Sequence, residues 1–162
     1  MTENSIDRMQ WRSVAPHRLP GFDYASPHHA YFVTACARDG DPFADPRLAQ
    51  QIVDSLHWLH HERALLVYAY TLMPDHLHLL AGLQTSDRTL GQLLGAFKSF
   101  TTRQSWRLGY RGALWQPRFY DHIVDRAPDG RSIAGYILEN PVRRGLIASG
   151  DEYPWSGRPD PL

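Results

Sequence analysis

The segment Leu65-Leu-Val-Tyr-Ala-Tyr-Thr-Leu-Met-Pro-Asp-His-Leu-His-Leu-Leu-Ala-Gly-Leu83 predicts a β-hairpin. Residues 65–73 read as one strand and residues 76–83 as the next, because both runs are rich in apolar and β-forming side chains. Pro74-Asp75 supplies the tight link between them. The hairpin predicts an antiparallel sheet, to which the neighbouring segments can be added.

The segments on either side of the hairpin alternate between strand and helix patterns. We expect strands at 31–37 and 118–124, and helices at 47–63, 90–107 and 132–140. Phe97 and Phe100 are expected to face inward from the second helix. Ser132 would cap the last helix, and Pro141 would end it. This order predicts an α+β domain, an antiparallel sheet with helices packed on one face.

Length and composition indicate one domain. The chain has 162 residues, 43% of them hydrophobic, which suffices for one core. Residues 1–30 contain several prolines and no periodicity, which predicts an irregular N-terminal arm. Cys36 is the single cysteine, so an internal disulfide and a cysteine-rich zinc site are both excluded. With no signal sequence or long apolar run, we expect a cytoplasmic protein.

Charge is distributed unevenly along the chain. The formal net charge is zero, yet residues 88–144 hold ten basic side chains against four acidic ones. Nearly all of these basic residues are arginine, whose planar guanidinium matches the geometry of phosphate. A codon preference for arginine would give the same composition. The second half of the chain is therefore a candidate for contact with an anionic partner.

Two histidines stand out in the hairpin. Residues two apart in a strand project from the same face, so His76 and His78 are expected to lie side by side. Leu77 and Leu79 would anchor the opposite face to a core. Two neighbouring neutral imidazoles suit a divalent cation. The spacing is equally compatible with two polar side chains on the solvent face of a strand.

A third informative segment runs from Gly135 to Leu146. On a helix, Tyr136, Glu139 and Asn140 would share a face, which brings together a phenol, a carboxylate and an amide. Two arginines follow at 143 and 144, close enough to hold a phosphate beside the phenol. The alternative is an ordinary amphipathic helix with a tyrosine at the edge of the core.

Four motifs occur together in one order along the chain. They are Met73-Pro-Asp-His-Leu-His78, Phe97-Lys-Ser-Phe100, Leu114-Trp-Gln-Pro-Arg-Phe-Tyr-Asp-His122 and Tyr136-Ile-Leu-Glu-Asn-Pro-Val-Arg-Arg-Gly-Leu146, followed by Trp155-Ser156. In this combination the chain resembles the single-tyrosine transposases of the IS200/IS605-like type. Within these it is most similar to the REP-associated tyrosine transposases. The resemblance covers roughly residues 31–156, the expected catalytic core of a single domain, 1–162.

The resemblance implies a set of roles. His76 and His78 match the histidine–hydrophobic–histidine (HUH) motif, which binds a divalent metal, Mg²⁺ or Mn²⁺. Tyr136 matches the nucleophile, and Asn140 stands where the family commonly places a third metal ligand. The implied fold is a ferredoxin-like or RRM-like antiparallel sheet, with the histidine strand central and the tyrosine helix packed across it.

The resemblance also implies a reaction and a partner. The reaction is DNA cleavage by tyrosine transesterification, through a 5′-phosphotyrosine intermediate. The partner is single-stranded or hairpin DNA, in particular a REP-type palindrome, bound by a monomer, although related mobile transposases act as dimers. The basic residues that we expect to contact DNA are Lys98, Arg103, Arg107, Arg118, Arg143 and Arg144.

Two other functions remain open from the sequence. Paired histidines on a strand also occur in other metal-dependent hydrolases, but such an activity gives the Tyr136 segment no role. A relative that binds DNA without cleaving it would keep the same fold. Nothing in the sequence favours this second alternative, since both histidines and the tyrosine are present.

Overall fold

The structure is a computed structural model that describes residues 22–23, 29–62, 65–85, 87–124 and 127–162. Most of the expected arm, 1–30, therefore lies outside the described residues. The strands are β1 (Ala30–Cys36), β2 (Leu65–Met73), β3 (His76–Leu83), β4 (Tyr120–Val124) and β5 (Ser156–Gly157). The helices are the 3-10 turn η1 (Pro42–Ala44), α2 (Pro46–His61), α3 (Leu90–Arg107) and α4 (Ala127–Arg143).

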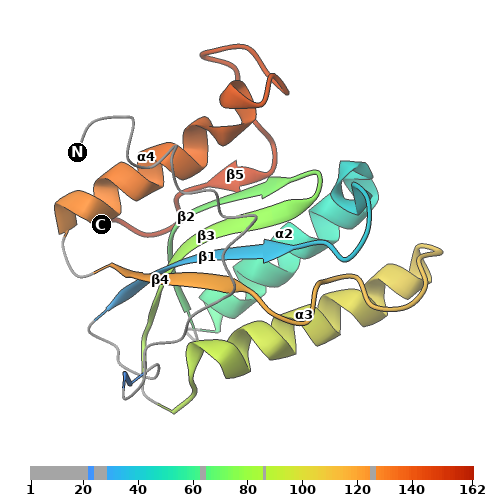
Figure 1. Ribbon diagram of the computed structural model, residues 1–162, viewed down its shortest axis with the longest axis horizontal. Helices are drawn as coiled ribbons and strands as arrows, with labels where there is room; N and C mark the ends of the chain where they lie inside the picture. Colours follow the sequence, from blue (N-terminus) through green and yellow to red (C-terminus); the bar gives the residue numbers. More distant parts are fainter. Residues whose placement is uncertain (1–21, 24–28, 63–64, 86, 125–126) are drawn as a thin grey trace.

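The strands form one antiparallel sheet in the order β4-β1-β3-β2-β5 (Figure 1). The predicted hairpin is confirmed as β2 and β3, and the histidine strand β3 is central. Its register on β1 places Thr34 opposite His78 and Cys36 opposite His76. Every residue of β3 is buried, because strands pair with both of its edges and helices cover both faces of the sheet.

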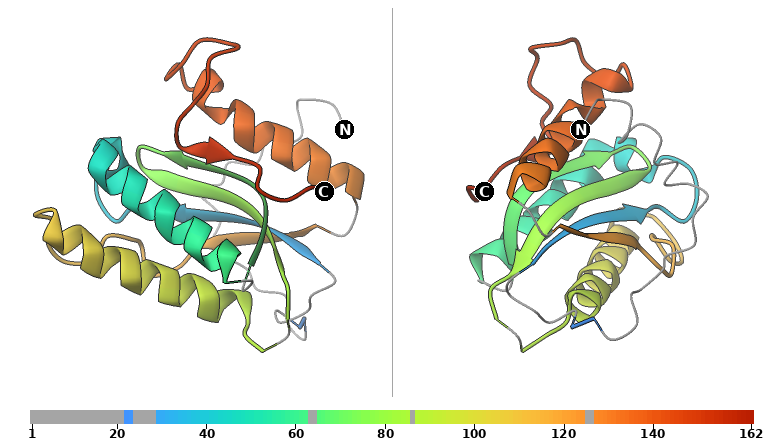
Figure 2. Two further views of the ribbon diagram at one scale, coloured as in Figure 1. Left: turned by 180° about the vertical axis from the view of Figure 1, so that it is seen from behind. Right: turned by 60° about the vertical axis from the view of Figure 1, so that its left-hand side comes forward.

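Two helices cover one face of the sheet. From behind, α2 and α3 run beside each other across it (Figure 2). Alternate residues of the strands, such as Leu77 and Leu79, join apolar residues of both helices in one core cluster. The N-terminus of α3 is fixed by Thr89, whose side chain accepts from the backbone N–H of Gln92, while the Gln92 side chain accepts from the Thr89 N–H.

The third helix, α4, covers the opposite face (Figures 1 and 2). Ala134 and Ile137 of α4 pack on Phe32, Ala69 and Leu80, a second and smaller cluster. The α+β class and the antiparallel sheet are confirmed, but the expectation that the helices lie on one face is wrong. The physical reason is that the second face of the central strands is also apolar, so it too must be covered.

Two local predictions about the helices are also wrong. Phe100 is 44% exposed, because the buried stripe of α3 runs from Phe97 to Thr101 and Ser105 at a spacing of four. Ser132 does not cap a helix; it lies inside α4 and donates to the Pro128 carbonyl, 3.2 Å away.

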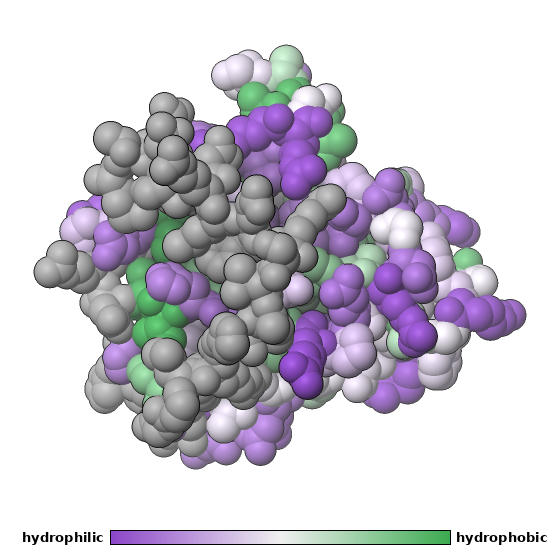
Figure 3. Space-filling view, viewed as in Figure 1, coloured by the Kyte–Doolittle hydropathy of each residue, from purple (hydrophilic) through white to green (hydrophobic). Residues whose placement is uncertain are grey.

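No helix in the described part of the chain is long and apolar enough to cross a membrane. In the space-filling view, hydrophilic residues predominate over the end of α3 (Figure 3). Arg103, Arg107 and Arg111 are exposed in this region. The basic character expected for the second half of the chain therefore reaches the surface here.

Candidate active site

The two histidines of β3 converge on one point. The Nε2 atoms of His76 and His78 are 3.1 Å apart, and the side chains are on the α4 face of the sheet. Two nitrogens that each lie about 2.1 Å from one ion, at an angle of roughly 90–100°, would be separated by about this distance. The residues are only 7% and 4% exposed. They are therefore not polar residues on a solvent-facing strand.

The other ring nitrogen of each histidine is held by a neighbour. Asp75 Oδ1 lies 2.6 Å from Nδ1 of His76, and Thr34 Oγ1 lies 2.9 Å from Nδ1 of His78. A carboxylate accepts the Nδ1 hydrogen of His76, which leaves a lone pair on Nε2. The Thr34 hydroxyl can accept from His78 in the same way. Such partners fix the orientation of metal-binding histidines and raise their basicity.

The electrostatics favour a neutral imidazole at His78. Burial lowers the pKa of His78 well below its usual range, and the charges of His76 and Arg144 lower it further. A neutral ring keeps a lone pair for an incoming cation. The site is therefore ready to accept a positive ion without first losing a proton from this residue.

Tyr136 lies next to the histidines. Its ring centroid is 5.9 Å from that of His78 and 6.3 Å from that of Phe32, which packs against both. The Arg143 guanidinium lies 5.2 Å from the centre of the Tyr136 ring, a cation–π arrangement. Tyr136 is only partly buried, so the ring can be approached from solvent.

The tyrosine helix is tied to the sheet at a proline. Helix α4 continues through Pro141, where the sequence predicted its end. Pro141 has no N–H, so the carbonyl of Ile137, four residues earlier, loses its helical donor. The Thr71 hydroxyl of β2 takes the place of that donor, 2.8 Å from the Ile137 oxygen. This hydrogen bond explains how the helix passes the proline and fixes it beside Tyr136.

Asn140 and Glu139 differ in their placement. Asn140 is 3% exposed, and among the described residues no hydrogen-bond partner of its side chain is found. The Glu139 side chain is 67% exposed and lies 3.7 Å from Arg143. Glu139 is thus linked to the Tyr136 side of the helix through Arg143, which lies over the Tyr136 ring, but it is not buried with Asn140. Helix α4 continues to Arg143, past the end that the sequence predicted, so Asn140 lies in a buried turn within the helix.

In the described part of the chain, no three His, Cys, Asp or Glu side chains gather as a metal site. A metal at His76 and His78 would therefore need a third donor of another kind. Asn140, one turn beyond Tyr136, carries such a donor, its amide oxygen.

Comparisons with known proteins agree with the motifs. Over 98 residues, the chain is 31% identical to a Haemophilus influenzae protein described as a candidate REP-associated tyrosine transposase; the match covers 54% of this chain and 56% of that protein. It is 27% identical over 95 residues to a REP-associated tyrosine transposase of Escherichia coli, covering 59% and 55%. The chain is a relative of the REP-associated tyrosine transposases.

A solved structure of a REP-associated tyrosine transposase bound to a REP hairpin has the same fold. Its TM-score is 0.72 at 22% identity, over 88% of this chain and 82% of that one. No family model matches the chain. The chain spans a little over half the length of the two REP-associated relatives that it matches.

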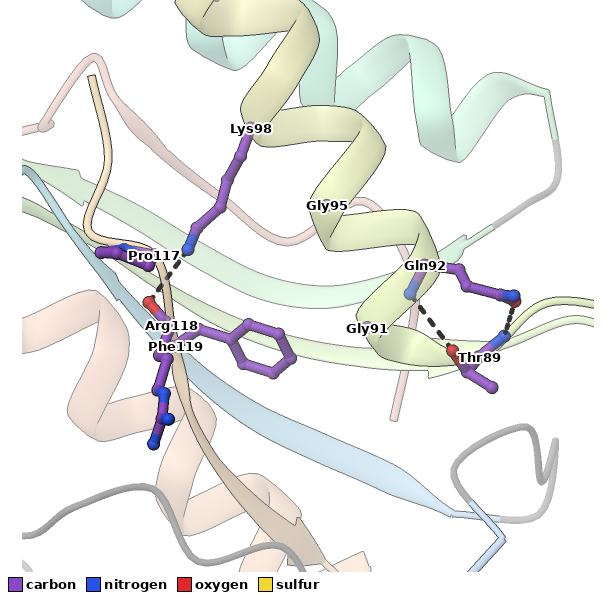
Figure 4. Close-up of a pocket in the computed structure, with 8 residues that line it drawn as sticks. All are labelled: Thr89, Gly91, Gln92, Gly95, Lys98, Pro117, Arg118 and Phe119. Carbon is purple, nitrogen blue, oxygen red and sulfur yellow. Dashed lines mark hydrogen bonds between the residues drawn. The ribbon is translucent and has the colours of Figure 1, made fainter. Parts of the chain in front are cut away.

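The six basic residues expected at DNA lie in three places on the structure. Arg143 and Arg144 stand at the end of α4 beside the tyrosine, whereas Arg103 and Arg107 are exposed on α3, which covers the other face. The remaining two, Lys98 and Arg118, lie at the groove between α3 and β4 (Figure 4).

Sequence reasoning missed three residues that support the site. Asp75 was available as a signal, since it directly precedes His76 in the turn. Thr34 and Thr71 come from other strands, 44 and 66 residues from their partners His78 and Ile137. Nothing in the local sequence around either threonine marks these contacts.

Proposed function

We propose that the chain is a metal-dependent tyrosine transposase that nicks and joins single-stranded or hairpin DNA. The observation that carries the proposal is the convergence of the His76 and His78 Nε2 atoms, 3.1 Å apart, next to the Tyr136 ring. A phenol beside two histidines places a nucleophile next to ligands for a cation that could stabilise the charge on a phosphate. The expected core, residues 31–156, holds all of these groups.

The donor set fits a divalent cation. His76 and His78 would supply nitrogen ligands, and the amide oxygen of Asn140 a third, harder donor. Imidazole together with oxygen suits Mn²⁺ and is compatible with Mg²⁺. When bound, the ion supplies charge stabilisation for the non-bridging phosphate oxygens and the departing 3′ oxygen.

The chain's own residues would carry the covalent step. The Tyr136 oxygen attacks the scissile phosphorus and loses its proton to solvent or a nearby base. The bond from phosphorus to the 3′ oxygen breaks, and that oxygen takes up a proton. The products are a 5′-phosphotyrosine and a free 3′-hydroxyl. Attack by a 3′-hydroxyl on the phosphotyrosine reverses the step, so that strands are joined without ATP.

The arginines at the end of α4 would position the phosphate. Arg143 already lies over the Tyr136 ring, and Arg144 is close enough to lower the pKa of His78. Their positive charge would hold a phosphodiester near the phenol and offset the charge that develops during attack.

The substrate that we propose is a REP-type hairpin with unpaired flanks. The solved relative is bound to a REP hairpin, and the two sequence relatives carry the REP-associated name. A backbone that must bend into a site between a helix and a sheet is more easily supplied by unpaired DNA than by a duplex.

Trapping a covalent adduct tests the proposal. With Mn²⁺ or Mg²⁺ and a labelled hairpin, the protein should form an SDS-resistant protein–DNA adduct, which Tyr136→Phe abolishes. Tyr110→Phe is the matched control, because that hydroxyl contacts Asp45 on the α2–α3 side and should leave the adduct unchanged. An adduct that persists in Tyr136→Phe excludes this nucleophile. Cleavage without any adduct would favour a metal-dependent hydrolase.

A further inference from the structure

Strand β5 is a two-residue edge strand that lies beside the tyrosine helix α4 (Figures 1 and 2). It pairs with β2, with Gly157 opposite Tyr70 and Ser156 opposite Thr71. So short a strand forms few ladder hydrogen bonds, and other contacts must set its place on the sheet. These contacts differ between its two residues.

The aromatic ring of Tyr70 covers Gly157. A Cβ atom added at Gly157 would lie 2.7 Å from Cε1 and 2.9 Å from the hydroxyl oxygen of Tyr70, closer than non-bonded atoms pack. The backbone of Gly157 is not in the left-handed region, so glycine is needed here for space and not for its conformational freedom. Tyr70 therefore rests directly on the backbone of β5.

Helix α2 holds Tyr70 in this place. The Tyr70 hydroxyl lies 3.0 Å from Nε2 of His57, and the two rings meet edge to face with their centroids 5.6 Å apart. Tyr70 is only 3% exposed and belongs to the larger core cluster. Burial, and secondly the charge of Asp54, raises the pKa of Tyr70, so the hydroxyl stays uncharged beside His57. The ring can move away from Gly157 only by breaking these contacts.

Ser156 uses the other face of the same strand. Neighbouring residues of a strand face opposite sides of the sheet, so Gly157 is on the α2 side and Ser156 on the α4 side. The Ser156 hydroxyl lies 2.8 Å from Thr71 Oγ1, and Thr71 donates to the Ile137 carbonyl of the tyrosine helix. The position of β5, which Tyr70 sets on one face, therefore decides on the other face whether Ser156 reaches Thr71.

The chain is fixed on either side of β5. The backbone N–H of Leu72 donates to the Trp155 carbonyl, 2.8 Å away. Further along, the N–H of Asp160 donates to the Val67 carbonyl, and the Asp160 carboxylate accepts from the Val67 N–H. Because both ends are held in this way, a push on β5 is taken up within the strand itself.

We propose that Tyr70 is a positioning residue for the reaction at Tyr136. Held by His57, the Tyr70 ring keeps β5 where Ser156 reaches Thr71, and Thr71 in turn fixes the tyrosine helix. Tyr70 lies on the face of the sheet opposite to Tyr136, so it acts only through this path. This inference rests on the proposed function, because it concerns the rate of the same covalent step.

Gly157→Ala tests the path by adding one methyl group. We expect β5 to shift and adduct formation at saturating hairpin and Mn²⁺ to slow about tenfold, because the nucleophile is held less precisely. The dissociation constants of the hairpin and of Mn²⁺ should not change. Tyr70→Phe, which keeps the ring but frees it from His57, should give a smaller loss of rate. Tyr110→Phe is the matched control, because it removes a hydroxyl that contacts Asp45 and should leave the rate unchanged.

Ser156→Ala separates positioning from a general loss of structure. It removes the hydroxyl at the far end of the path, so it should slow adduct formation as Gly157→Ala does. The double variant should be no slower than the slower single variant, because both changes interrupt the same path. Losses of rate that multiply, or a parallel loss of Mn²⁺ affinity, would show independent structural effects and overturn the inference.

Hydrogen exchange measures the same coupling without DNA or metal. Amides in the last turn of α4 should exchange faster in Gly157→Ala and Ser156→Ala than in the unchanged protein, whereas Tyr110→Phe should have no effect. Urea unfolding checks that each variant is folded, and Tyr70→Phe, which adds no atoms, serves if Gly157→Ala does not fold. Unchanged exchange in the folded variants removes the role of Tyr70, whether or not the protein cleaves DNA. The proposed function fails separately, if the unchanged protein forms no adduct through Tyr136.

Discussion

Thr71 donates a hydrogen bond to the carbonyl of Ile137, across 2.8 Å from the sheet to the helix that carries Tyr136. The Thr71 hydroxyl has a single hydrogen, so the Ser156 hydroxyl, 2.8 Å away, must donate to Thr71. Ser156 belongs to β5, near the C-terminus. A chain of hydroxyls therefore links the last strand, the second strand and the tyrosine helix.

Thr71→Val should separate positioning from metal binding. Valine keeps the shape but leaves the Ile137 carbonyl unpaired in a fully buried place, so we expect a loss of about 1–3 kcal/mol in the free energy of unfolding. The tyrosine helix would then be held less precisely, and the rate of adduct formation should fall about tenfold or more. Mn²⁺ affinity, measured by calorimetry, should stay unchanged. Thr71→Ser, which retains the hydroxyl, should restore the rate; a parallel loss of metal affinity would contradict this assignment.

Thr34→Val, in contrast to Thr71→Val, should weaken metal binding. It removes the hydroxyl that lies 2.9 Å from Nδ1 of His78, and loss of such a partner typically weakens metal binding 10- to 100-fold. Calorimetric titration with Mn²⁺ measures this, and Thr34→Ser is the control that keeps the hydroxyl. Unchanged affinity in the valine variant would show that Thr34 does not orient His78 for a metal.

Stability should depend on pH through His78. A histidine in the unfolded chain titrates near ~6.5, and burial holds the pKa of His78 well below that in the folded protein. As the pH falls below about 6.5, the unfolded state binds the proton first, so the free energy of unfolding decreases. We expect the protein to lose more stability between pH 7.5 and 5.5 than His78→Gln does, in urea unfolding with EDTA present. Equal losses of stability in the two proteins would contradict the lowered pKa of His78.

The sequence predicted the elements whose signals are local. The hairpin strands 65–73 and 76–83 and the helix 90–107 have the predicted bounds, because apolar periodicity and the Pro74-Asp75 turn are short-range features. The histidine pair was found for the same reason, since strand alternation alone places both rings on one face.

The remaining features depend on contacts between distant segments. Pro141 predicted a helix end, and only the hydroxyl of Thr71, 66 residues from Ile137, allows the helix to continue. Because the helix continues to Arg143, Asn140 lies within it and is buried. Likewise, Phe100 could be placed outward only after α3 had been docked on the sheet, with Thr101 donating within the helix to the Phe97 carbonyl.

Arg144→Gln should weaken binding of single-stranded DNA and make that binding less dependent on the salt concentration. Arg144 is exposed at the end of α4, and its charge acts on His78, which places it near the expected scissile phosphate. Loss of one phosphate contact on a single strand should reduce the slope of log affinity against log salt by about 0.7. Adduct formation should slow as well, because less positive charge remains beside Tyr136.

Arg131→Gln is the matched control for Arg144→Gln. Arg131 is exposed on the same helix but lies more than one turn before Tyr136, at the other end from Arg144. The change in net charge is identical, so a general electrostatic effect would reduce the salt slope equally in both variants. If Arg144 contacts a phosphate at the active site, only Arg144→Gln should show the larger change in salt slope and slower adduct formation. Fluorescence anisotropy over 50 to 200 mM salt, a range of about fourfold, is wide enough to separate the two slopes.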